Sequence, residues 1–191
     1  MKDYFDASAR ELNEIIKETL GSNSCSLAEF AEKTAACLKS GGKIMLAGNG
    51  GSAADAQHIA AEFVVRLKED RRAYPAIALT TDTSVLTACG NDLSFEMIFS
   101  RQIEALGKEE DIFIALSTSG NSPNILLAAE KAREKGIYTA GITGKSGGKL
   151  KELCDININI KSEKSMRIQE AYMFLMHTAC ELIENTLAGG D

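Results

Sequence analysis

The sequence contains only two histidines, and both have neighbours that could make them chemically active. His58 precedes Glu62 by four residues, so on a helix the imidazole and the carboxylate would lie on one face. Such a pair can share a divalent metal ion, or act as a base and the group that orients it. From the pair alone, a surface ion pair is the favoured interpretation. His177 follows Gln169 by eight residues, a rise of about 12 Å on a helix. Its apolar neighbours would also suit a buried structural histidine.

A glycine-rich loop, residues 48–53 (GNGGSA), follows an apolar run and opens a helical stretch. The carboxyl end of a strand in an open α/β sheet is where ligands bind. Glycines let a ligand approach the backbone, and the free N–H groups of the following helix favour an anion, so a tight turn is the less favoured interpretation. The loop also fits the dinucleotide-binding pattern G-x-G-x-x-A, which requires an acidic residue at the end of the second strand, about 20 residues further on. Glu69 and Asp70 come before the second predicted strand and Asp82 comes after it, so dinucleotide binding is the weaker interpretation.

A second polar loop, residues 117–122 (STSGNS), follows the apolar run 112–116. Its hydroxyls and the free N–H groups of the next helix could hold a phosphomonoester without a lysine. Pro123 suits the first position of that helix, and Ser122 suits its N-cap. Serine-rich loops are also common as turns, but the place at a strand end favours a phosphate site.

The elements that must position these residues alternate along the chain. Helical stretches separate five apolar runs of strand length, which are residues 43–47, 76–79, 112–116, 137–142 and 156–160. Because parallel strands need crossover connections, this order predicts an α/β sandwich with a mostly parallel sheet. The spacing also predicts two helices before the first strand, over residues 2–20 and 26–39, and a long helix over residues 165–187.

Composition narrows the class of protein. The chain has 191 residues, 45% of them hydrophobic and 25% charged, which suits one compact domain. Its formal charge of -6 makes nucleic acid and anionic membranes poor partners. We find no apolar run near the roughly 18 residues that span a bilayer, and the first residues carry acids rather than an apolar signal sequence. Five cysteines without a CxxC pair indicate neither disulfides nor a zinc ribbon, so we expect a cytoplasmic protein.

These motifs, in this order and at this spacing, resemble the phosphoheptose isomerases, which are sugar isomerase (SIS) domain proteins. The resemblance covers nearly the whole chain. It implies one SIS domain over residues 1–191, with an N-terminal helical pair (1–40) and a flavodoxin-like three-layer core (41–191) that includes the long last helix. The residues that carry it are 48–58 (GNGGSAADAQH) with Ala60, Ala61 and Glu62, then Asn91 and Asp92, the loop 117–122, and 167–170 (RIQE) with His177.

The resemblance implies that the chain converts sedoheptulose 7-phosphate to D-glycero-D-manno-heptose 7-phosphate. This is the first step in making activated heptose for bacterial surface polysaccharides such as lipopolysaccharide. The positions that match the family's substrate contacts are Asn49, Gly50, Gly51, Ser52, Glu62, Asn91, Asp92, Ser117, Thr118, Ser119, Ser122 and Gln169. The positions that match its metal ligands are His58, Glu62, Gln169 and His177, for one divalent ion per subunit, zinc by the resemblance.

Aldose–ketose isomerisation moves a proton between C1 and C2 of the open-chain sugar through an enediol. It needs a base for the carbon and an acid for the oxygens. Glu62 is the preferred base and His177 its partner, while Asp92 is a candidate for positioning or opening the sugar ring. A metal held by the same cluster would polarise the carbonyl. Whether Glu62 is a ligand, the base or both stays open.

Two other functions stay open. A non-catalytic SIS adaptor that binds a replication initiator protein resembles the chain in its glycine loop, but it lacks the acid and the final histidine that are present here. An isomerase of a shorter or amino sugar phosphate would keep the phosphate loop and differ near C1 and C2. The helices that precede a complete α/β unit have little sheet left to cover, so their apolar faces would be exposed in a monomer. We therefore expect a homo-oligomer, and the resemblance implies a homotetramer.

Overall fold

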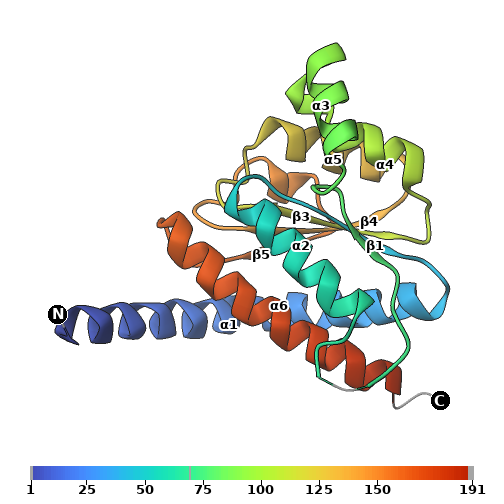
Figure 1. Cartoon of the computed structure of the whole chain (residues 1–191). Helices are drawn as coiled ribbons and strands as arrows, with labels where there is room; N and C mark the ends of the chain where they lie inside the picture. The colour runs from blue at the N-terminus through green and yellow to red at the C-terminus, as the bar shows by residue number, and fades with distance from the viewer. Residues whose placement is uncertain (1, 69, 189–191) are drawn as a thin grey trace.

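The computed structural model describes residues 2–68 and 70–188. Five parallel strands form one sheet in the order β2-β1-β3-β4-β5, with helices on both faces (Figure 1). The strands are β1 (Ile44–Ala47), β2 (Ala76–Ala78), β3 (Ile112–Ser117), β4 (Tyr138–Thr143) and β5 (Ile156–Asn159). Each predicted apolar run contributes one strand, so the predicted parallel α/β sandwich is confirmed.

The helices divide between the two faces of the sheet. Figure 1 shows α1, α2 and α6 on one side and α3, α4 and α5 on the other. Their bounds are α1 (Lys2–Lys39), α2 (Gly51–Val64), α3 (Thr83–Asp92), α4 (Ser100–Leu106), α5 (Pro123–Glu134) and α6 (Ser165–Ala188), with short 3-10 helices η1 (Phe95–Met97) and η2 (Leu150–Glu152). Among the residues described, none of these helices is both long and apolar enough to cross a membrane.

The sheet separates two hydrophobic cores because side chains alternate along each strand. In β3, Ile112, Ile114 and Leu116 enter the core that is covered by α1, α2 and α6. Phe113 and Ala115 enter the core on the other face. All six residues of β3 are buried, as expected for a central strand of a parallel sheet that is covered on both faces.

The prediction of two N-terminal helices was wrong, because residues 2–39 form one continuous helix, α1. The expected break lay at residues 21–25 (GSNSC), where helix propensity is low. In the structure, Asn23 donates to the carbonyl of Asn159 at 3.2 Å and accepts from its N–H at 3.1 Å. Thr19 Oγ1 accepts from the N–H of Lys161 at 3.1 Å. These hydrogen bonds to β5 and the segment after it hold the helix together where its own sequence is weak.

The long last helix was predicted correctly, and its position matters for the site. It is observed as α6, which packs against both α1 and α2. Its apolar face includes the buried Ile168, Leu175 and Ile183. This packing places the middle of α6 beside α2, the helix that follows the glycine loop.

Candidate active site

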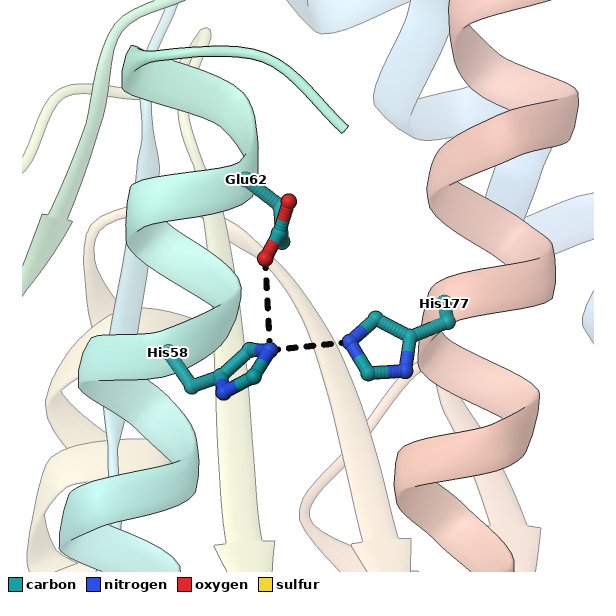
Figure 2. Close-up of side chains that lie close together, drawn as sticks. All are labelled: His58, Glu62 and His177. Carbon is teal, nitrogen blue, oxygen red and sulfur yellow. Dashed lines mark hydrogen bonds and ion pairs between the residues drawn. The ribbon is translucent and has the colours of Figure 1, made fainter. Parts of the chain in front are cut away.

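Three of the predicted site residues meet between α2 and α6 (Figure 2). His58 and Glu62 lie one turn apart on α2, and His177 faces them from α6. His58 Nε2 lies 3.2 Å from Glu62 Oε1 and 2.9 Å from His177 Nε2. One potential ligand atom from each side chain lies within 4.8 Å of the other two. The cluster therefore joins two segments that are 119 residues apart in the sequence.

This geometry suits either proton transfer or a divalent metal. In the hydrogen bond between the two imidazoles, one Nε2 must donate and the other must accept. In a tetrahedral zinc site with Zn–N bonds of about 2.0–2.1 Å, neighbouring ligand atoms lie roughly 3.3 Å apart. The observed 2.9 and 3.2 Å are close to this spacing, and all three ligand atoms lie within 4.8 Å of one another, so the three side chains could hold such an ion. The side chain of His58 is 50% exposed and that of Glu62 20%, which leaves the cluster open to a substrate.

Gln169, the fourth predicted ligand, lies beside the glycine loop in this structure. Its Nε2 donates to Asp55 Oδ2 at 3.2 Å. A Cβ atom added to Gly51 would lie only 2.3 Å from the same Nε2, so the glycine allows the amide to approach. Gln169 precedes His177 by about two turns of α6. Its assignment as a metal ligand stays a prediction.

The glycine loop connects β1 to α2, as the sequence predicts. Gly50 has a φ of +56°, a backbone conformation that favours glycine. Asn49 and Asn124 exchange two side-chain hydrogen bonds, each 2.8 Å long. Because Asn124 lies in the first turn of α5, this amide pair joins the glycine loop to the helix that follows the serine loop. The two predicted ligand loops therefore lie next to each other at the carboxyl ends of adjacent strands, β1 and β3.

The serine loop lies between β3 and α5. Ser117 is the last residue of β3, and Ser122 is at the N-cap position before Pro123, as predicted. The Ser122 hydroxyl faces Ser117 Oγ at 3.2 Å, so two of the predicted phosphate ligands lie together. Thr118 and Ser119 are partly exposed between them.

The segment after β4 supports the serine loop. The Gly144 N–H donates to the Thr118 carbonyl at 3.2 Å, and the Leu150 N–H donates to the Gly120 carbonyl at 2.9 Å. The Lys149 N–H donates to the side chain of Asn121 at 3.1 Å. These hydrogen bonds from the segment after β4 hold the backbone and the Asn121 side chain of the serine loop in place.

Ser52 has a structural partner that the sequence analysis missed. It is buried, and its Oγ lies 2.9 Å from the hydroxyl oxygen of Tyr172. The single O–H of Tyr172 donates to Asp55, which leaves the Ser52 hydroxyl to donate to the Tyr172 oxygen. Burial together with the Asp55 carboxylate raises the pKa of Tyr172 above its usual range. Tyr172 has the spacing of a core residue in α6, so only the packing of α6 on α2 identifies its polar role.

Asn91 and Asp92 do not join the cluster within this chain. They end α3, which lies across the sheet from α2 and α6 (Figure 1). Both are exposed, and Asn91 Nδ2 donates to Asp92 Oδ1 at 2.8 Å. Their part in substrate binding stays a prediction.

Comparisons with known proteins identify the family of this chain. The SIS domain family matches residues 3–144. Phosphoheptose isomerase 1 of Campylobacter jejuni is 52% identical over 160 residues, which cover 84% of this chain and 86% of that protein. The phosphoheptose isomerase of Clostridium acetobutylicum is 48% identical and covers 99% of this chain and 97% of its own.

Solved structures give the same result. The phosphoheptose isomerase of Neisseria gonorrhoeae matches with a TM-score of 0.90 at 38% identity, covering 96% of this chain and 98% of that one. The enzyme of Francisella tularensis matches with a TM-score of 0.91 at 34% identity, covering 96% and 97%. The fold is thus that of the SIS class of sugar isomerases. Within that class, the chain belongs to the phosphoheptose isomerase family, as its motifs indicate.

Proposed function

We propose that the chain is an aldose–ketose isomerase that converts sedoheptulose 7-phosphate to D-glycero-D-manno-heptose 7-phosphate in bacterial heptose synthesis. Membership of the phosphoheptose isomerase family supports this reaction. The single observation that carries the proposal is the meeting of Glu62 with His58 and His177. An SIS adaptor has no use for a carboxylate and two imidazoles in one open cluster, whereas an isomerase needs a base and an acid together.

In this mechanism Glu62 is the base. It removes the proton from C1 of the ketose, and the electron pair of that C–H bond forms the double bond of the enediol. The proton then returns to C2, which gives the aldose. His177 moves the proton between the two oxygens, and His58, at 3.2 Å from Glu62 Oε1, orients the carboxylate. Asp92 is proposed to help position or open the ring.

We further propose that His58, Glu62 and His177 hold one divalent metal ion per subunit, zinc by family resemblance, with Gln169 as the fourth ligand. The mutual distances of the three ligand atoms support this assignment. When bound, such an ion would polarise the carbonyl and hydroxyl oxygens of the substrate.

The phosphate is assigned to the serine loop. Ser117, Thr118, Ser119 and Ser122 supply hydroxyls, and they lie at the N-terminus of α5, where the helix dipole favours an anion. The neighbouring glycine loop, from Asn49 through Gly50 and Gly51 to Ser52, and the Gln169 amide are assigned to the sugar, together with Asn91.

We also propose that residues 1–191 form one SIS domain, that the protein acts in the cytoplasm, and that it assembles as a homotetramer. Exposed apolar side chains support the assembly. Leu20 of α1 and Phe174 and Leu182 of α6 lie exposed along an apolar groove between the two helices.

The test is an assay of the wild-type chain with sedoheptulose 7-phosphate beside several other ketose phosphates, repeated on Glu62→Gln. This variant keeps the shape of the side chain and removes the base, so we expect turnover to fall by about 10² to 10⁴. Substrate binding and fold should persist, and solvent-deuterium exchange at C1 should be lost. Glu181→Gln, one turn beyond His177 on α6, is the control. Wild-type turnover in Glu62→Gln would refute the base, and a wild-type chain inert toward all the sugars would favour the adaptor.

A further inference from the structure

A buried ion pair joins α6 to the segment that follows α2. Arg71 Nε donates to Glu184 Oε1 at 2.6 Å, and the two side chains are only 10% and 4% exposed. A second pair between the same two segments, Lys68 with Glu181, is 64% and 46% exposed. The two pairs therefore differ in burial although both link the same parts of the chain.

The remaining donors of Arg71 reach the end of α2 itself. Nη2 donates to the carbonyl of Glu62 at 2.7 Å, and Nη1 donates to the carbonyl of Phe63 at 2.9 Å. The last carbonyls of a helix have no partner within the helix, and a glycine often turns the chain so that they are satisfied. Here α2 ends at Val64, with Val65 at its C-cap. The Arg71 guanidinium binds the carbonyls of Glu62 and Phe63, and the Tyr74 N–H also donates to the Phe63 carbonyl at 3.1 Å. The residue that carries the proposed base is thus held through its own backbone.

Glu184 is placed to tie this end of α2 to the histidine on α6. It follows His177 by seven residues, two turns, so both side chains project from the same face of the helix. Its Oε1 also accepts from the Leu67 N–H at 3.1 Å. Burial alone would raise the pKa of Glu184, but the hydrogen bonds from Leu67 and Arg71 outweigh it and lower the pKa, so the carboxylate is charged.

A second set of contacts joins α6 to the other end of α2. Tyr172 on α6 binds Ser52 and Asp55 at the start of α2. The cluster of His58, Glu62 and His177 lies between the two sets of contacts, so the spacing of the helices at the cluster depends on both.

We propose that Arg71 and Glu184 are positioning residues that hold the carboxylate of Glu62 in place against His58 and His177. The inference rests on the proposed function for the part that Glu62 plays in turnover. Buried ion pairs add little net stability compared with apolar side chains of similar size. A role in positioning Glu62 therefore explains the burial of the Arg71–Glu184 ion pair better than a gain in stability does.

The experiment removes both charges together. Removing one partner would leave an unpaired buried charge and unfold the chain, whereas Arg71→Met/Glu184→Met replaces the pair with apolar side chains of similar length. We expect this double variant to fold and to keep its KM for sedoheptulose 7-phosphate, because the serine loop is unchanged. Its kcat should fall by about 10- to 100-fold, as when the partner of a site residue is lost. Arg71→Lys, which keeps the charge but cannot bind both carbonyls, should lose kcat similarly.

Binding of Co²⁺ gives a readout that does not depend on turnover. Titration followed by the visible absorption of the bound ion should show an affinity about 10- to 100-fold weaker in the double variant than in wild type. Glu181→Gln, which breaks the exposed ion pair between the same segments, should match wild type in kcat, KM and Co²⁺ affinity.

The outcomes separate this inference from the proposed function. A folded double variant with wild-type kcat and Co²⁺ affinity would overturn the inference. A wild-type chain that binds Co²⁺ but does not isomerise the sugar would overturn the proposed function, and weaker Co²⁺ binding by the double variant would still support positioning. A wild-type chain without either property has no site for Arg71 to position, and the inference fails with it.

Discussion

Single hydroxyl groups decide how the serine loop would hold a phosphate. Ser119 and Ser122 offer hydroxyls beside the first turn of α5, and each charge-assisted hydrogen bond to a phosphate contributes about 1–3 kcal/mol. We therefore expect Ser119→Ala/Ser122→Ala to raise KM for the sugar phosphate and to weaken inhibition by inorganic phosphate, with a smaller effect on kcat. Ser40→Ala, at the end of α1, is the control. An unchanged KM in the double variant would place the phosphate elsewhere.

The carboxylate of Glu184 also predicts how stability depends on pH. Its folded-state pKa lies below the usual value of 4.5, so the stability that it contributes is present above that pH and is lost as the pH falls through the lower folded value. Urea unfolding between pH 7 and 3 should show wild type losing more stability below about pH 4.5 than Arg71→Met/Glu184→Met does. Parallel pH curves for the two proteins would contradict this.

At the scale of elements, two glycines in different surroundings give opposite expectations. Gly120 has a φ of +64°, and an added Cβ would lie 1.9 Å from the Gly147 carbonyl oxygen. Gly120→Ala should therefore displace the serine loop, raise KM and cost about 1–3 kcal/mol of stability. Gly21 lies within α1, and a Cβ there meets no described atom within 4 Å. Gly21→Ala should stabilise the protein by roughly 1 kcal/mol in denaturant unfolding. A loss of stability in Gly21→Ala would contradict the expectation for α1, and unchanged KM and stability in Gly120→Ala would contradict the expectation for the serine loop.

The sequence predicts elements whose apolar spacing reveals their burial, and it misses features that depend on individual hydrogen bonds to distant residues. The strands and α6 are evident because apolar spacing reports burial directly. The continuity of α1 is not evident, because Asn23 and Thr19 bind the β5 region, 136 and 142 residues away. The same limit applies to the site. His58 and Glu62 are related by helix spacing, but Arg71 lies in a charged stretch that looks like a solvated loop, and its role follows only from the packing of α6.

For the whole molecule, the groove between α1 and α6 predicts assembly. Its exposed side chains, Leu20, Phe174 and Leu182, would be covered by a second copy. Sedimentation at micromolar concentration should show a homotetramer for wild type and smaller species for Phe174→Glu/Leu182→Glu. A wild-type monomer with full activity would contradict the proposed assembly.

The contact between His58 and His177 also bears on how the chain withstands heat. A metal ion held there would cross-link two segments separated by 119 residues, and the unfolded chain offers it no comparable site. An ion at 100 times its dissociation constant stabilises the folded state by about 2.7 kcal/mol, so a chelator should lower Tm, and wild type should lose more than His58→Ala. All five cysteines are free. The ion would thus close a long loop much as a disulfide does in a secreted protein, but reversibly and under the control of metal supply.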